Sequence, residues 1–183
     1  MKYTKGTSTQ LSKNFKSTEF DCKCKGLCKE TTVDEKLVVI LQNIRDHFGK
    51  PITINSGYRC SSHNKNVGGA SSSRHLTGSA ADIVVRNTAP IEVARYAESI
   101  GVKGIGLYDW GCHIDTRTSK SFWKTADIIK VDTFMEKKPV VEKVVTYDYY
   151  VSVGPFSSKE DAVATKDTLI KGGNTAVVVT IEK

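Results

Sequence analysis

Residues 73–82 read SRHLTGSAAD and lead directly into the apolar residues 83–85, IVV. A loop of small and polar residues that carries His75 therefore opens into a buried strand, with Asp82 near its start. His113 follows later, within a second apolar stretch. Two imidazoles and one carboxylate suit Zn²⁺, and three protein ligands leave the fourth tetrahedral position open to water, as in catalytic sites. The alternative is that these residues only pack in a core and cap a turn.

The flanking sequence predicts a mixed α+β domain. A capping-box pattern at residues 32–35, followed by apolar residues at helical spacing up to Phe48, predicts a helix that ends at Gly49. A second helix is expected at residues 90–100. The polar residues 61–79 are expected to form a long loop that carries function. Strands are expected at residues 52–54, 81–85, 104–108 and 112–115, the last two as a hairpin. The fold class is therefore α+β, with helices on a small antiparallel sheet.

The sequence beyond this domain predicts a linker and a small C-terminal unit. Residues 132–146 are rich in charge and contain a proline, which favours a linker. Strands are then expected at residues 147–153 and 176–181, around a helix opened by a second capping box at residues 157–160. This is one β-α-β unit. We therefore expect three parts: residues 1–131, 132–146 and 147–183.

Composition and charge restrict the class of protein. The chain has 183 residues, with 27 Lys and Arg against 20 Asp and Glu, for a formal net charge of +7. This charge favours polyanions such as those of a bacterial wall. There is no basic cluster with interleaved aromatic residues, so we expect no nucleic-acid partner. No apolar run reaches the ~18–20 residues that span a bilayer, so we expect no membrane segment. The N-terminus lacks the apolar stretch of a secretory signal peptide, so none is expected.

Residues 73–82 resemble a known family. They match the pattern S-x-H-x-x-G-x-A-x-D of the zinc D-alanyl-D-alanine carboxypeptidases and their endopeptidase relatives. Residues 56–59, 64–70 and 104–115 also resemble the subgroup of that family found in phage lysins and bacterial wall hydrolases. The resemblance extends over about residues 12–130. It implies a Hedgehog/DD-peptidase-like fold, a zinc cofactor and peptidoglycan as the substrate.

The resemblance also implies a role for each matching residue. The implied zinc ligands are His75, Asp82 and His113. Arg59 is implied to bind the substrate's carboxylate or to polarise the scissile carbonyl, although an ion pair that fastens its loop would also explain it. Ser73 is expected to brace its loop by hydrogen bonding and to lie, with Tyr108, among the residues that bind substrate.

The general base is less clearly marked. Many relatives carry Glu or Asp three residues before the last histidine ligand, and here that position is Trp110. The nearby carboxylates are Asp109 and Asp115. Asp115 lies two residues after His113, hence on the same strand face, and we expect it to be the base or a supporting residue. Asp109 is the rival candidate.

The implied reaction is zinc-dependent hydrolysis of stem-peptide amide bonds next to D-amino acids. The sequence leaves open whether a terminal D-Ala is released or the stem is cut internally. We expect a phage endolysin or wall hydrolase, acting at the bacterial cell wall after phage lysis releases it from the host cytoplasm. The alternative is a catalytically inactive, zinc-stabilised peptidoglycan-binding protein, because Trp110 occupies the usual base position.

Two further features stay open at this stage. Four of the five cysteines allow three interpretations: a structural zinc site, disulfides that pin the N-terminal arm to the Arg59 loop, or free thiols. These four are Cys22, Cys24, Cys28 and Cys60. Cys112 is expected to pack.

Residues 149–162 resemble the opening of a SPOR repeat, a peptidoglycan-binding module. A full SPOR domain has two such halves, so this one predicts wall binding or a homodimer; a simple packing extension is the alternative.

Overall fold

The computed structural model describes residues 1–125, 129–136 and 158–171. The chain forms two compact units, Met1–Lys137 and Lys138–Lys183, which we call the first and second units. None of the described helices is both long and apolar enough to cross a membrane.

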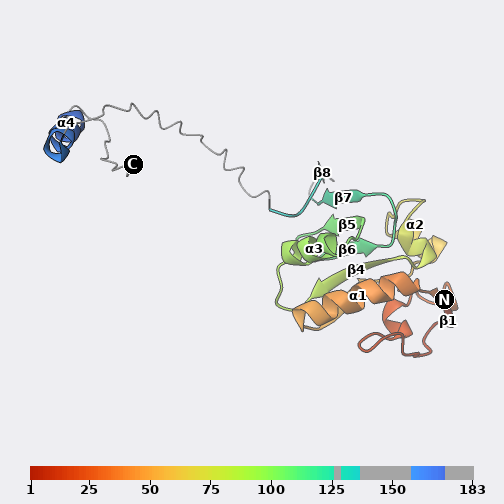
Figure 1. Cartoon of the computed structure of the whole chain (residues 1–183). Helices are drawn as coiled ribbons and strands as arrows, with labels where there is room; N and C mark the ends of the chain where they lie inside the picture. The colour runs from red at the N-terminus through yellow and green to blue at the C-terminus, as the bar shows by residue number, and fades with distance from the viewer. Residues whose placement is uncertain (126–128, 137–157, 172–183) are drawn as a thin grey trace. The chain divides into compact units, whose positions relative to one another are not determined.

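A six-stranded sheet forms the centre of the first unit, in the order β3-β4-β6-β5-β7-β8 (Figure 1). Neighbouring strands are antiparallel except for β5 and β7, which are parallel. The strands are β3 (Ile52–Ser56), β4 (Ala80–Val85), β5 (Gly104–Leu107), β6 (Cys112–Asp115), β7 (Ser121–Lys124) and β8 (Ile129–Lys130). A second, two-stranded sheet pairs β1 (Lys2–Thr4) with β2 (Glu30–Thr32). The expected α+β class and the 104–115 hairpin are confirmed.

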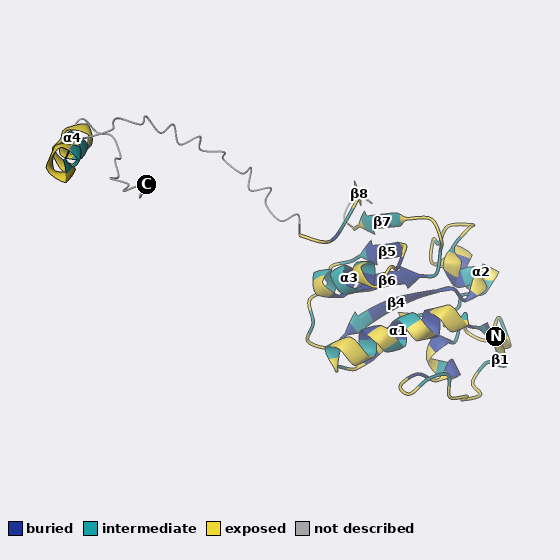
Figure 2. Ribbon diagram, in the orientation of Figure 1, coloured by how far each residue is buried: buried dark blue, intermediate teal, exposed yellow. Residues whose placement is uncertain are grey.

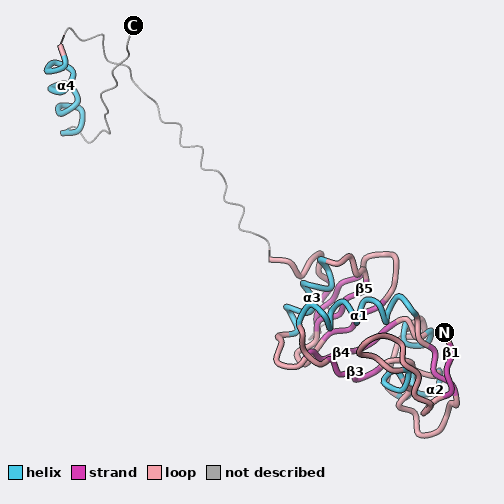
Figure 3. The backbone as a smooth tube through the Cα atoms, turned by 60° about the horizontal axis from the view of Figure 1, so that its bottom comes forward, coloured by secondary structure: helices cyan, strands magenta, loops and turns pink. Residues whose placement is uncertain are grey.

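Two amphipathic helices cover one face of the six-stranded sheet. The helices α1 (Glu35–Phe48) and α3 (Pro90–Ser99) contact each other and strands of this sheet (Figure 3). The buried face of α1 contains Leu37, Leu41 and Ile44. Figure 2 shows that burial is concentrated in the central strands beneath the helices. The core therefore lies between the helices and one face of the sheet.

Strand alternation leaves the opposite face free for polar side chains. In β4 the core includes Ile83, while Asp82 points the other way. In β6 the core includes Ile114, while His113 points away from the helices. The polar residues predicted as ligands thus share the face that the two long helices do not cover.

The boundaries of the predicted helices agree closely with the structure, with one correction. The N-cap of α1 is Asp34, whose side chain accepts a hydrogen bond from the backbone N–H of Lys36 at 3.0 Å. The predicted cap, Thr32, instead belongs to β2, because this residue pairs with the N-terminal strand. Gly49 ends the helix in the left-handed region at φ 62°. The predicted second helix is confirmed as α3.

Two other expectations need correction, and four strands were not anticipated. The predicted loop 61–79 contains a short helix, α2 (Ser61–Asn66), and a 3-10 turn, η2 (Arg74–Thr77). The linker begins later than residue 132, because the first unit includes Phe134, which is 3% exposed and packs against Phe122. The strands β1, β2, β7 and β8 were not predicted.

The second unit contains the predicted helix. It is α4 (Lys159–Lys171), and the side chain of Ser158 accepts a hydrogen bond from the N–H of Asp161 at 3.1 Å. The strands predicted at residues 147–153 and 176–181 lie outside the described residues.

Candidate metal centre

The loop before β4 places His75 in the interior of the first unit. The turn η2 begins after Ser73, whose hydroxyl accepts a hydrogen bond from the N–H of His75 at 3.4 Å and so braces the loop as expected. Gly78 ends the turn at φ 69°, and any Cβ there would overlap the carbonyl of Thr32. This tight packing leaves His75 only 2% exposed.

Strand pairing brings Asp82 and His113 together. They lie directly opposite each other in β4 and β6, so their side chains leave the same face of the sheet. His113 Nδ1 is 2.9 Å from Asp82 Oδ1. His75 Nε2 is 3.4 Å from Asp82 Oδ2 and 3.3 Å from His113 Nδ1. One ligand atom from each of the three residues lies within 4.8 Å of the other two. The structure thus brings together all three predicted ligands.

The outer partner of each imidazole determines which nitrogen can bind a metal. His75 Nδ1 lies 2.7 Å from the carbonyl oxygen of Gly57. Because a carbonyl only accepts hydrogen bonds, Nδ1 carries the proton and Nε2 keeps a lone pair for the cluster. His113 Nε2 lies 3.0 Å from a carboxylate oxygen of Asp115, so Nδ1, which faces Asp82, is the nitrogen that can bind a metal. Two imidazoles and a buried carboxylate fit zinc.

Asp115 is engaged on every side. Its side chain is 0% exposed, and Arg117 donates to both of its carboxylate oxygens, at 2.6 to 2.9 Å through the guanidinium. Burial alone raises the pKa of Asp115, but hydrogen bonds from His113 and Arg117 outweigh it and hold the pKa well below its usual range. These contacts are those of a residue that orients His113.

Two glycines of β5 make room for this arrangement. Gly104 lies directly opposite Asp115, and a Cβ at Gly104 would overlap its carboxylate. At Gly106 a Cβ would overlap the indole of Trp123. The guanidinium of Arg117 in turn lies 5.5 Å from the Trp123 ring centroid. Neither Trp123 nor Arg117 was predicted from the sequence as part of this site, although the two alternate glycines signalled large side chains opposite them.

Two of the predicted substrate-binding residues, Arg59 and Tyr108, interact with Asp82. Arg59 Nη2 is 2.5 Å from Asp82 Oδ2, and Arg59 Nε donates to Ser56 Oγ at 2.7 Å. The ion pair considered for this arginine is therefore present. Burial, with a further contribution from the charge of Asp82, raises the pKa of Tyr108. The ring of Tyr108 stacks on that of the exposed Trp110, with centroids 5.1 Å apart.

Other residues of the resembling motifs fasten loops. Asn64 is buried, and its amide donates to the carbonyl of Ala70 at 2.9 Å. A Cβ at Gly69 would overlap the Asn64 side chain. Asp109 is exposed in the bend between β5 and β6, so its role as rival base stays a prediction.

Comparison with known proteins agrees with this geometry. The sequence pattern of the peptidase M15 family matches residues 13–116, more than half of the chain. The chain belongs to the peptidase M15 family. The zinc D-Ala-D-Ala carboxypeptidase of Streptomyces albus G is 57% identical to this M15 domain over 44 residues, which cover 24% of this chain and 17% of that relative. The family, this relative and the His-Asp-His donor set together indicate zinc as the cofactor, as predicted.

Proposed function

We propose that this M15 peptidase hydrolyses amide bonds in the peptide stems of bacterial peptidoglycan, next to a D-amino acid. The observation that carries the proposal is the buried cluster of His75, Asp82 and His113, in which both outer imidazole nitrogens are already held. Similarity to a zinc D-Ala-D-Ala carboxypeptidase supports the substrate class. Release of a terminal D-Ala and cleavage within the stem both fit this site.

The residues of the cluster are prepared to hold the metal. His75 Nε2, His113 Nδ1 and the carboxylate of Asp82 would bind zinc. Bound zinc supplies a Lewis acid that polarises the scissile carbonyl and activates water. Burial opposes the charge of Asp82, but hydrogen bonds from His113 and His75 keep its pKa well below the usual range, so the carboxylate is ionised at neutral pH.

Neighbouring residues supply charge and a proton donor. Arg59, already at Asp82, places a fixed positive charge beside the cluster, where it can bind a substrate carboxylate or offset the negative charge that develops on the carbonyl oxygen. The raised pKa of Tyr108 keeps its hydroxyl protonated, so it can donate a hydrogen bond to substrate. Ser73 contributes indirectly, by bracing the loop that carries one of the metal ligands.

The two carboxylates proposed for proton transfer now differ. Asp115 has both oxygens occupied by His113 and Arg117 and has no exposed surface. Asp109 is exposed to solvent. A general base must reach the water that it deprotonates. We therefore propose that Asp115 positions His113, which leaves Asp109, the remaining candidate, as the base.

Digestion of purified peptidoglycan tests the proposed activity. We expect soluble products that disappear with a zinc chelator and return when zinc is added back. Mass spectrometry then identifies the bond: free D-Ala indicates a carboxypeptidase, and released stem peptides indicate an endopeptidase. An unchanged digest on walls of several stem chemistries would instead favour the inactive peptidoglycan-binding protein, the alternative suggested by Trp110 at the usual base position.

In the cell we place this enzyme at the bacterial wall, as a phage endolysin or wall hydrolase that reaches its substrate after phage lysis. The resemblance of residues 104–115 to the lysin subgroup supports this role.

For residues 147–183 we propose a half SPOR-like unit that binds the wall or pairs with a second copy. A single predicted β-α-β unit would bury little of its own surface and would therefore need a partner. Light scattering of the full chain at rising concentration should show a dimer. A monomer at the highest concentration, combined with no sedimentation on insoluble peptidoglycan, would contradict this proposal.

A further inference from the structure

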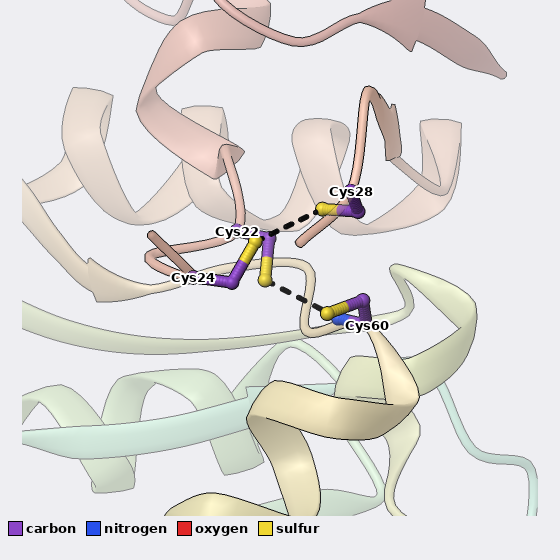
Figure 4. A group of neighbouring side chains, drawn as sticks. All are labelled: Cys22, Cys24, Cys28 and Cys60. Carbon is purple, nitrogen blue, oxygen red and sulfur yellow. Dashed lines mark hydrogen bonds between the residues drawn. The ribbon is translucent and has the colours of Figure 1, made fainter. Parts of the chain in front are cut away.

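Four cysteines from separate parts of the sequence converge at one point of the first unit. Cys22, Cys24 and Cys28 lie in the segment between the 3-10 turn η1 (Ser17–Phe20) and β2, whereas Cys60 immediately precedes α2. Their side chains point toward one another (Figure 4). All four Sγ atoms lie within 4.8 Å of one another, and none of the four forms a disulfide.

We propose that these four thiols bind a second zinc ion in a closed structural site. Zinc–sulfur bonds of about 2.3 Å in a tetrahedron place neighbouring sulfurs about 3.8 Å apart. The Sγ atoms of Cys24 and Cys28 are 3.3 Å apart, and no pair in the cluster exceeds 4.8 Å. The cluster therefore has the size of a zinc site with four cysteine ligands. Two disulfides would need only two separate pairs and would not require all four sulfurs to share one centre.

The backbone holds the two sides of this site together. The N–H of Tyr58 donates to the carbonyl of Phe20 at 2.9 Å, and a Cβ at Gly57 would lie 2.6 Å from Phe20 Cα. Cys22 and Cys60 each lie two residues beyond this contact. The N–H of Cys60 also points to Cys22 Sγ at 3.3 Å, an interaction that favours a thiolate.

The remaining two ligands are positioned by a glycine turn. The N–H of Gly26 donates to the carbonyl of Cys24 at 2.8 Å, and its φ of 79° allows the chain to reverse and bring Cys28 back. The three-residue gap between Cys24 and Cys28 falls within the C-x2–4-C range of zinc sites. Lys5 Nζ lies 3.3 Å from Cys24 Sγ, so an ammonium group balances part of the negative charge of four thiolates.

This site has a structural consequence for the segment before α1. That segment contains little regular structure, with only the short strands β1 and β2 and the turn η1 among its elements. A metal can supply stability that such a segment lacks. It would also fix Cys60, which adjoins Arg59 and so the ion pair with Asp82. The proposal does not depend on the proposed function, because it concerns a different set of ligands.

Metal analysis of purified full-length variants tests the proposal. We expect two zinc ions per chain in the wild type and one in Cys28→Ser. Cys28→His should retain both, because three cysteines and one histidine also form a structural zinc site. Cys112→Ala is the matched control: the fifth cysteine donates to the carbonyl of Pro90, lies outside the cluster, and should leave both ions in place.

Cobalt substitution separates the two sites. The wild type and His113→Ala should both show sulfur-to-cobalt charge-transfer absorption, and Cys28→Ser should lose it. Two results would overturn the proposal. One is a wild type that binds a single zinc ion, which His113→Ala then loses. The other is a native protein with disulfides among these cysteines. Because wild-type stoichiometry decides by itself, a poorly folded Cys28→Ser would not obscure the result. A wild type that shows the sulfur–cobalt absorption but does not hydrolyse peptidoglycan would refute only the peptidase proposal.

Discussion

Replacement of His75 by alanine is expected to abolish peptidoglycan hydrolysis and to remove one bound zinc ion. His75 is buried, with Nε2 directed at Asp82 and His113 and Nδ1 held by the carbonyl of Gly57. Among the described residues, the cluster contains no fourth ligand side chain that could take the place of His75. Loss of an outer partner of a metal ligand costs about 10–100-fold. Loss of a ligand itself should exceed this and reduce activity to background.

The measurement compares zinc content and product release in His75→Ala and His47→Ala. His47 is exposed on α1, where its ring stacks on Tyr96 at 3.7 Å, on the face of the sheet opposite the cluster. This control should keep full zinc content and activity. If His75→Ala retained chelator-sensitive hydrolysis, the reaction would have to occur elsewhere on the chain.

Much of the metal cluster could be predicted because its signals are local. The residues around His75 and Asp82 are contiguous, and their spacing is visible in one line of sequence. The position of Asp115 relative to His113 also follows from strand periodicity. What could not be predicted is which oxygens of Asp115 are already occupied, because Arg117 closes back on it from beyond the strand end. The sequence therefore favoured Asp115 as base, while its contacts favour positioning.

The fold shows the same division between local and long-range signals. The helix α1 was predicted from its spacing, but its cap was assigned to Thr32 because the pairing of β2 with a strand far earlier in the sequence has no local signature. The short helix α2 has too few residues to show a helical period. The cysteine cluster depends on the contact between Phe20 and Tyr58, so the sequence could only list its alternatives.

Replacement of Asp115 by asparagine is expected to weaken zinc binding by about 10–100-fold, the usual cost of losing an outer partner. The physical reason is the tautomer of His113. Arg117 donates to both oxygens of Asp115, so the amide NH₂ of an asparagine meets a donor at whichever oxygen it replaces. An NH₂ group at the Oδ2 position faces His113 Nε2, which must then accept. The proton moves to Nδ1, the nitrogen that faces the cluster, and the lone pair for the metal is lost.

Zinc titration distinguishes this positioning role from a catalytic one. If Asp115 orients His113, added zinc should restore much of the activity of Asp115→Asn. Asp109→Asn should instead bind zinc normally, and its rate should be about 10²–10⁴-fold lower at every zinc concentration, which is the usual cost of removing a general base. The opposite pattern, with normal zinc affinity and a rate defect in Asp115→Asn and no defect in Asp109→Asn, would return the base to Asp115. If both variants remain fully active, neither carboxylate transfers the proton. Zinc affinity and rate thus separate two roles that the sequence leaves joined, because an orienting partner acts on the metal and a base acts on the water.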